Sequence, residues 1–173
     1  YHNHYYCAKI EQYNFTLDNH MKTLSNFISG SVGDNLRYYI TPFLTKLIIN
    51  GTGAMTDFKD RSSRPWDNYK NTIYSAKIEN GATTISDFAF SDCVNIISVK
   101  IPDTVTKIGN FAFENCLNLV DVILPDNLDS IGLNLFYNCS SIPFCIIPTK
   151  VTQIPDYTFY NCSELFFVEF HEK

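Results

Sequence analysis

The chain has 173 residues, enough for one domain with a substantial core or for one repeat array with a flanking piece. Charged residues make up 18% and aromatic residues 15%, a balance that excludes a disordered chain. The net charge of −5, without any Lys/Arg cluster, disfavours nucleic-acid binding through phosphate neutralisation. No apolar run approaches the roughly 20 residues of a membrane span. Tyr1 is not an initiator methionine, so we expect residues before it in the natural chain.

The first stretch of the chain, YHNHYYCAKIEQYNFT, carries no clean period and is rich in tyrosine. His2, His4 and Cys7 could suggest a metal site, but their spacing matches no zinc pattern. We therefore predict a loosely packed terminus over residues 1–16, and neither a metal nor a cofactor bound to it.

A helical pattern follows from Leu17 onward. Asp18 is a plausible N-cap, Gly30 is a natural stop, and the residues between them that share helical spacing are Met21, Leu24, Phe27 and Ile28. The pattern predicts a short amphipathic helix over about 18–28. Because the terminal units of a repeat array need a cap, we expect its apolar face to cover the first end of the array.

Residues 31–56 predict two strands. Leu36, Tyr38 and Ile40 alternate with polar residues, Thr41-Pro42 interrupts the pattern, and a β-rich run over 44–49 follows. We expect that run to end in a turn at Gly51-Thr52-Gly53. No Lys-Ser/Thr follows these glycines, so they do not indicate a phosphate-binding loop.

The polar stretch over residues 57–72 is broken by Pro65 and predicts a loop. Trp66, the only tryptophan, is expected to anchor this loop on the remainder of the chain. The predicted organisation is a helix and β-rich cap over 1–56, the loop over 57–72 and a repeat array over 73–173, all in one continuous domain.

A period of 23 residues dominates the remainder of the chain. The segment over 101–122, IPDTVTKIGNFAFENCLNLVDV, recurs with changes from residues 78, 124 and 147. Three columns keep their residue type in all four copies, namely Ile85, Ile108, Ile131 and Ile154; Phe90, Phe113, Phe136 and Phe159; and Cys93, Cys116, Cys139 and Cys162. A fixed period of this size predicts a solenoid, in which each coil buries its apolar side against its neighbours.

The sequence of each coil predicts a strand, a bend and a short turn. Extended residues with Leu119, Val122 and Leu124 facing inward should stack at a spacing of about 4.8 Å into a parallel sheet. The Phe-Ala-Phe segment over 111–113 predicts one turn of 3₁₀ or α-helix, and the glycine at Gly109 (and at Gly132 one coil later) a tight bend with positive φ. Because the turn side is bulkier than the sheet side, we expect a curved α/β solenoid with its sheet on the concave face.

Six cysteines could pair as disulfides. Four of them fill one interior slot in successive coils, so we favour buried free thiols over disulfides. Cys145 takes a slot that holds Val99 and Val122 in other coils, and it is also expected in the core. Only Cys7 lies outside the pattern.

The pattern I-P-x-x-V-x-x-I-G-x-x-A-F-x-x-C-x-x-L-x-x-V resembles the BspA-like leucine-rich repeats. The run LIINGTGAM over 47–55 also resembles the lead-in that precedes such arrays, and the resemblance covers roughly residues 30–170. Departures at Leu135, at Ile142-Pro143 and at Pro155 are expected to change local geometry and not the fold. The resemblance implies a curved leucine-rich-repeat solenoid at the cell surface or secreted, which binds host or cell-surface proteins without catalysis. The alternative is an intracellular scaffold or structural repeat protein that self-associates.

Catalytic groups are not apparent in the array. All four histidines lie outside the repeats, and Asp103 and Asp126 are typical turn residues that lack the apolar setting of a tuned acid–base pair. We therefore predict no enzyme activity. Four Asn-x-Ser/Thr sequons are compatible with secretion without demonstrating it, at Asn14, Asn50, Asn138 and Asn161.

The alternation along each strand predicts two outward-facing columns on the sheet. One column runs Ser75, Ser98, Asp121, Phe144 and Phe167, and the other Lys77, Lys100, Ile123, Ile146 and Glu169. The candidate partner-binding residues on these columns are Lys77, Lys100, Asp121, Ile123, Phe144, Ile146, Phe167 and Glu169. Three alternatives to partner binding remain open for this patch, namely an array that continues beyond Lys173, a contact with a second copy, and a homodimer formed through the exposed end of the solenoid.

Overall fold

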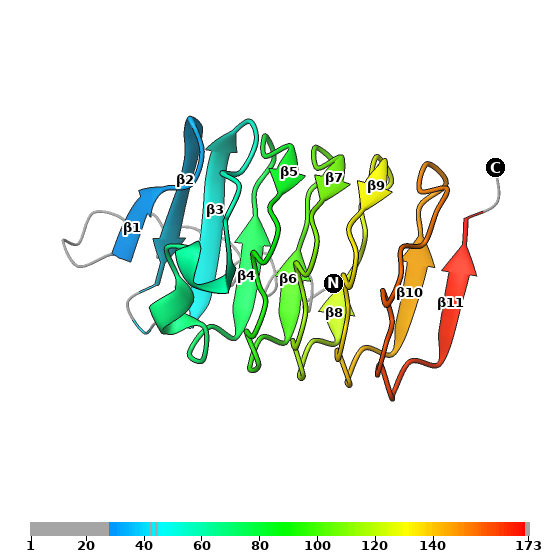
Figure 1. Cartoon of the computed structure of the whole chain (residues 1–173). Coiled ribbons are helices and arrows are strands. Elements are labelled where there is room, and N and C mark those ends of the chain that lie inside the picture. Colours follow the sequence, from blue (N-terminus) through cyan, green and yellow to red (C-terminus); the bar gives the residue numbers. More distant parts are fainter. Residues whose placement is uncertain (1–27, 42, 44, 172–173) are drawn as a thin grey trace, which may run out of the picture.

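The computed structural model describes residues 28–41, 43 and 45–171. These residues form a β-solenoid whose coils stack side by side in a row (Figure 1). The strands are β1 (Ile28–Ser31), β2 (Asn35–Ile40), β3 (Lys46–Thr52), β4 (Ser75–Ile78), β5 (Thr84–Ile85), β6 (Ser98–Lys100), β7 (Lys107–Ile108), β8 (Asp121–Val122), β9 (Ser130–Ile131), β10 (Phe144–Ile147) and β11 (Phe167–Phe170). Two 3₁₀ helices, η1 (Arg61–Ser63) and η2 (Asp67–Tyr69), lie in the loop before β4. Within the described ranges there is no α-helix, and so none long and apolar enough to cross a membrane.

Three sheets run along the array. The main sheet has the order β1-β2-β3-β4-β6-β8, with antiparallel pairs at β1–β2 and β2–β3 and parallel pairs after that. The second sheet, β5-β7-β9, is parallel, and β10 and β11 form a separate parallel pair. The predicted parallel stacking is therefore confirmed, with an interruption between β8 and β10. The curvature stays a prediction, and so do the domain boundaries.

The β-rich lead-in is confirmed as two strands, with Leu36, Tyr38 and Ile40 buried on one face of β2. The predicted turn after β3 is wrong, because β3 runs through to Thr52 and Gly53 pairs in parallel with Ala82. Gly51 is needed for another reason. Its φ is +120°, and a Cβ there would lie 2.0 Å from the carbonyl oxygen of Asn35.

The amphipathic helix predicted over about 18–28 lies, except for its last residue, outside the described residues. That last residue, Ile28, begins strand β1, and the expected stop at Gly30 pairs with Tyr38 within the same sheet. The described part of the chain therefore gives this helix no support.

The core is a set of side-chain columns that run along the array. Phe90, Phe113 and Phe136 are fully buried, and their rings stack on one another at centroid distances of 5.4 and 5.5 Å. Phe159 continues the stack at 5.8 Å and is partly exposed. Equivalent residues stack because successive coils differ by one sheet spacing, so each ring meets its own copy.

The cysteine column consists of free thiols, as predicted. Cys93, Cys116 and Cys139 are buried, and burial raises the pKa of Cys93 to about 12. The thiol of Cys116 donates to the Phe90 carbonyl oxygen at 3.1 Å, and Cys139 and Cys162 each make the same bond one and two coils later. A small side chain with a weak donor suits this slot, because it fills the interior and satisfies a buried carbonyl group.

One of two local predictions for this part of the coil is wrong. Residues 111–113 form the single turn that was expected, closed by the bond from Glu114 N–H to the Phe111 carbonyl oxygen at 3.2 Å. Gly109 and Gly132 do not have positive φ, and a Cβ on either would come within 2.5 Å of the preceding coil. Glycine is therefore required there by the close approach of two coils and not by backbone conformation.

The loop over 57–72 is fastened to the array by Trp66, as predicted. Trp66 is fully buried, its indole Nε1 donates to the Ala89 carbonyl oxygen at 2.8 Å, and its ring packs on Phe90 at 6.3 Å. In the coil before the first repeat, Trp66 thereby occupies the position that a phenylalanine of the stacked column holds in the later coils. Beside it, the buried guanidinium of Arg64 donates to the Phe88 carbonyl oxygen at 2.7 Å.

Candidate functional site

The outward face of the strands β4, β6, β8, β10 and β11, called the sheet face below, carries the eight predicted partner-binding residues. Strand pairing places Ser75, Ser98 and Asp121 in register in one column, and Phe144 beside Phe167 further along it. In the second column Lys77 pairs with Lys100, and Ile146 pairs with Glu169. Six of the eight residues are exposed, and Asp121 and Ile146 are half-buried.

The first part of the sheet face is charged and internally paired. The Lys100 ammonium lies 2.7 Å from the Asp121 carboxylate, and Lys77 lies 3.7 Å from Glu79. These side chains remain well exposed, so each ion pair contributes little to stability, on the order of 0–1 kcal/mol. Because their charges are compensated on the face itself, this part offers little net charge to a partner.

The second part of the sheet face is apolar. Phe144 and Phe167 are 38% and 45% exposed, and their rings stack with centroids 5.4 Å apart and planes within 9°. Ile123 is 65% exposed at the border between the two parts. The predicted patch is not one uninterrupted surface, because the break between β8 and β10 separates Ile123 from Ile146.

A third apolar column, at the entrance to the strands, was missed by the sequence analysis. The column holds Tyr74, Ile97, Val120, Pro143 and Phe166, and four of these side chains are 44–89% exposed. Strict alternation along a strand would point this position inward, but each of these residues precedes its strand and is not part of it. The 23-residue period, which places an apolar residue at this position in every coil, is the signal that could have found it.

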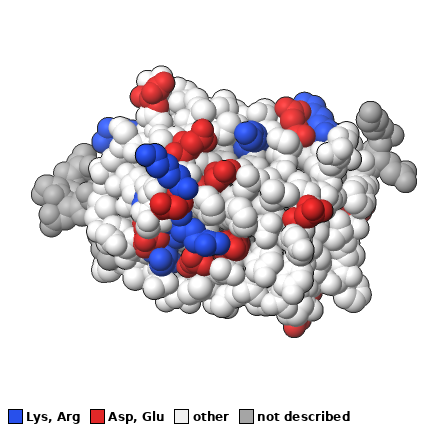
Figure 2. Space-filling view, viewed as in Figure 1, with Lys and Arg blue, Asp and Glu red and all other residues white. Residues whose placement is uncertain are grey.

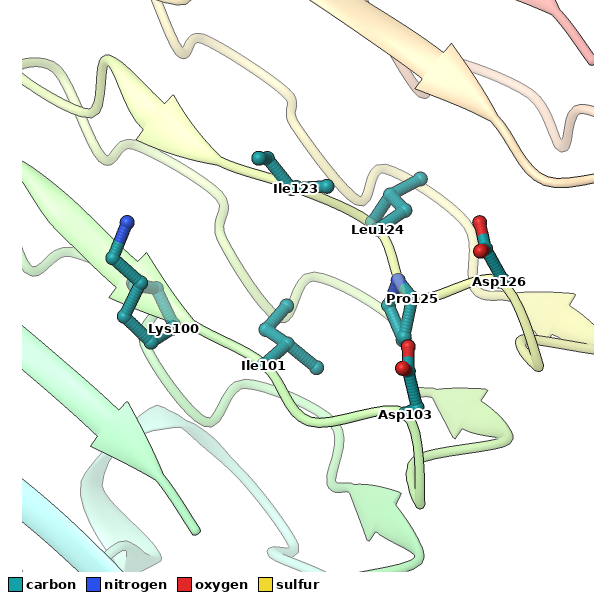
Figure 3. Close-up of a pocket in the computed structure, with 8 residues that line it drawn as sticks. Lys100, Ile101, Asp103, Ile123, Leu124, Pro125 and Asp126 are labelled. Carbon is teal, nitrogen blue, oxygen red and sulfur yellow. The ribbon is translucent and has the colours of Figure 1, made fainter. Parts of the chain in front are cut away.

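A groove of about 300 Å³ lies where β6 and β8 end (Figure 3). Its apolar wall comes from Ile101, Ile123 and Pro125. Lys100 lies on one side of the groove, and the carboxylates of Asp103 and Asp126 lie on the other. A second groove of about 470 Å³, one coil earlier, shares Lys100 and Ile101 with it. Open grooves of mixed polarity suit contact with a polypeptide better than enclosure of a small molecule.

The turn side is defined as residues 88–92 with their equivalents at 111–115, 134–138 and 157–161. There Arg61 donates from Nε to the buried carboxylate of Glu114 at 2.9 Å, and this bond raises the pKa of Arg61. The same guanidinium lies over the rings of Phe88 and Phe111 at 5.6 and 6.0 Å. Figure 2 shows charged side chains gathered over this part of the molecule, while most of the same face toward β10 and β11 is uncharged. The contact between Arg61 and Glu114 fastens the 57–72 loop to the array.

A ladder of side-chain amides also follows the turn side. Asn115 donates to Asp92 at 2.7 Å, Asn138 to Asn115 at 3.0 Å and Asn161 to Asn138 at 2.6 Å. All four residues have φ between +57° and +60°, a conformation that Asn and Asp tolerate better than most residues. The Asn-Cys step of the repeat therefore has a structural role, and two of the four sequons, at Asn138 and Asn161, fall within it.

Catalytic or metal-binding groups do not converge in the described residues. No three or more His, Cys, Asp and Glu side chains in this part of the chain could hold a metal ion. Of the four histidines only His171 is described, and it is exposed. The candidate metal ligands His2, His4 and Cys7 lie outside the described ranges.

A model of the BspA type leucine-rich repeat region matches residues 68–173 with six copies of the repeat. That match covers more than half of the chain. The chain belongs to the BspA-type leucine-rich repeat family. The resemblance of the repeat segments is thereby confirmed, and it agrees with the parallel strands and phenylalanine stack described above. No curated protein matches the chain.

Solved structures of leucine-rich repeat proteins share this fold. A leucine-rich repeat protein from Eubacterium ventriosum is 27% identical, with a TM-score of 0.67, over 85% of this chain and 45% of that one. A leucine rich cell surface protein from Faecalibacterium prausnitzii is 24% identical (TM-score 0.62, 83% of this chain, 43% of that one). A leucine-rich repeat protein from Bacteroides ovatus is 22% identical (TM-score 0.63, 85% and 40%). The BspA-type chain described here spans less than half the length of each of these proteins.

Proposed function

We propose that this chain is a non-enzymatic binding module that holds a protein partner against its sheet face. The observation that carries the proposal is the apolar surface formed by Ile123, Phe144 and Phe167 beside the entrance column that contains Val120 and Phe166. Exposed apolar side chains that gather on one face mark interaction sites, and solenoids bind through extended surfaces of this kind.

The partner we propose is a protein of a host or of another cell surface, met by a surface or secreted protein. Family membership supports this proposal, and so does the similarity to a structure named as a cell surface protein. Adhesion would then require the aromatic pair as a desolvated anchor, with Lys77, Lys100, Asp121 and Glu169 at a polar rim.

A binding screen against extracellular-matrix and cell-surface proteins tests the proposal. The test variant is the double change Phe144→Ser and Phe167→Ser. Its matched control is Tyr157→Ser and Tyr160→Ser, which removes a more exposed aromatic pair (61% and 53%) from the turn side. We expect the first variant to weaken binding at least tenfold, and the control to leave it unchanged. Equal binding by both variants, or loss only in the control, would remove the sheet face from consideration.

Self-association is the second candidate, favoured by strand β11, which pairs with β10 alone among the described strands, and by Phe170, which is 59% exposed. Sedimentation velocity over a hundredfold concentration range distinguishes it from binding to another protein. If the chain forms a dimer that the Phe144/Phe167 variant abolishes, the same surface serves a second copy and not a different partner.

A further inference from the structure

Both sheets of the array stop at the same boundary, between the coil of β8 and β9 and the coil that begins with β10. The main sheet ends at β8 and the second sheet at β9, and the next pair of strands forms a sheet of its own. The wider spacing between β8 and β10 is visible in Figure 1. The core columns continue across this boundary, so a change in side-chain packing does not explain the break.

On the main sheet the break coincides with a proline. In the entrance column, Ile97 N–H donates to Tyr74 at 2.8 Å, Val120 N–H to Ile97 at 3.0 Å and Phe166 N–H to Pro143 at 2.8 Å. Pro143 occupies the remaining place in this column and has no N–H to donate to Val120. No backbone hydrogen bond in the described residues joins β8 to β10.

On the second sheet a proline also stands at the break. Gly109 N–H donates to the Ile85 carbonyl oxygen at 2.8 Å, and Pro155 occupies the glycine position of the last coil without an N–H to donate. Across the described part of the chain, no backbone bond joins residues 130–131 to 153–154.

The turn side stays connected across the same boundary. Asn134, Phe136 and Asn138 donate their N–H groups to Asp156, Thr158 and Tyr160 at 3.2, 2.9 and 2.8 Å. The Phe136 and Phe159 rings stack there as well. Backbone hydrogen bonds therefore cross the boundary on the turn side and not in either sheet, which is the arrangement of a hinge. At the exposed corner between the two sheets, the Lys150 ammonium donates to the Asn127 side-chain oxygen at 3.4 Å, a side-chain contact that can break on opening.

We propose that this boundary is a hinge that regulates the sheet face, with residues 143–171 opening as a unit about the turn side. The proposal rests on the proposed function, because the apolar surface spans the hinge, with Ile123 on one side and Phe144 and Ile146 on the other. A partner that contacts both sides binds the closed form in preference and shifts the population toward it. The free protein samples the open form, since local opening is easiest where the fewest bonds join neighbouring units.

Cys145 is a native thiol that reports on this opening, so no cysteine has to be introduced. It is 4% exposed in β10, where it pairs with Val168 of β11, and burial raises the pKa of its thiol to about 12. Opening on the sheet side brings this thiol to solvent. Cys93 and Cys116 are equally buried in coils whose sheets are continuous, so they serve as internal references.

The experiment is alkylation of the native chain with N-ethylmaleimide, followed by peptide mapping that measures each cysteine separately. We expect Cys145 to react at least tenfold faster than Cys93 and Cys116. The double variant Pro143→Val and Pro155→Gly restores both N–H groups and should slow Cys145 about tenfold. Pro102→Ala, which changes a turn proline away from the boundary, should leave the rate unchanged.

Equal reaction rates of Cys145 and Cys93, or no effect of restoring the two N–H groups, would overturn the hinge. The comparison of Cys145 with Cys93 and Cys116 in the wild type needs no variant, so it tests the hinge even if the double variant fails to fold. The free protein suffices for both measurements, so a failed partner screen leaves the hinge result intact. With a partner from the screen, further slowing at Cys145 is expected, and unchanged labelling would overturn the regulation of the sheet face.

Discussion

The same 23-residue repeat builds two regions that differ in how firmly they are held. From β3 to β9 the coils share continuous ladders, a buried phenylalanine stack and a loop anchored by Trp66. The region over 143–171 keeps the same columns, but its sheet is separate, and its core residues Phe159, Cys162, Leu165 and Val168 are only partly buried. The core columns hold the same residue types in both regions. The difference in how firmly the regions are held therefore comes from the number of backbone N–H donors and of neighbouring coils, and not from the identity of the core side chains.

The phenylalanine stack gives the largest expected contrast between the two regions. Phe113→Ala should lower the free energy of unfolding by about 3–5 kcal/mol, because the ring is fully buried between two copies of itself. Phe159→Ala should cost less, about 1–3 kcal/mol, because this ring is partly exposed and has one stacked neighbour in the described residues. Urea unfolding followed by circular dichroism measures both, and equal losses would contradict the contrast.

The next prediction asks whether a proline placed one coil earlier also interrupts the main sheet. Val120→Pro removes the N–H that donates to Ile97 at 3.0 Å, so β8 should lose its pairing with β6. The side chain is 44% exposed, so we expect a loss of only about 1–2 kcal/mol in stability. Hydrogen exchange should accelerate at the amides of Val99 and Asp121. Val120→Ala, which keeps the N–H, should leave those amides protected, and acceleration in both variants would show that side-chain packing holds the strands together.

The amide ladder should also contribute more stability in the first region than in the second. Asn115→Ala removes a bond to Asp92 and one from Asn138 and places alanine at a φ of +58°, so we expect a loss of about 1–2 kcal/mol. Asn161→Ala should cost less, because Asn161 is exposed and makes a single ladder bond. Asn115→Gly tolerates the positive φ and isolates the amide bonds. If thermal unfolding shifts equally for Asn115→Ala and Asn161→Ala, the ladder contributes alike in both regions.

The cysteine column should show the smallest contrast, visible only at high pH. Burial raises the pKa of Cys93 to about 12 and of Cys162 to about 11, whereas an unfolded thiol titrates near 8.5. Raised pKa values mean that the stabilisation is fully present below pH of about 8.5 and is lost as the pH rises toward the folded values. Urea midpoints from pH 7 to 11 should therefore fall, less steeply in Cys93→Ala than in the wild type. Cys162→Ala should flatten the decline less, and an equal effect of the two variants would contradict the difference in burial.

Much of the fold could be predicted from the letters of the repeat, because a solenoid buries equivalent residues in equivalent slots. The buried phenylalanine column and the free thiols follow from that rule, and the anchoring role of Trp66 was predicted from its place in a polar loop. The errors lie where backbone conformation decides, as at Gly109, where a close approach mimics the requirement for positive φ, and at Gly51, where a strand continues through glycine. For the candidate site, the two outward-facing columns were predicted correctly, but the interruption of the sheet face between β8 and β10 was not.

By itself, the sequence determined the family, the period and the residues that face inward, because these depend on a pattern that each coil repeats. The tertiary structure decided which neighbours meet across coils, including the exposed entrance column and the compensation of Lys100 by Asp121. It also decided where the ladders end. Pro143 and Pro155 were recognised as departures from the repeat, but only stacking shows that they face the same boundary. The physical reason is that a missing N–H acts on the neighbouring coil, 23 residues away, and not on its own.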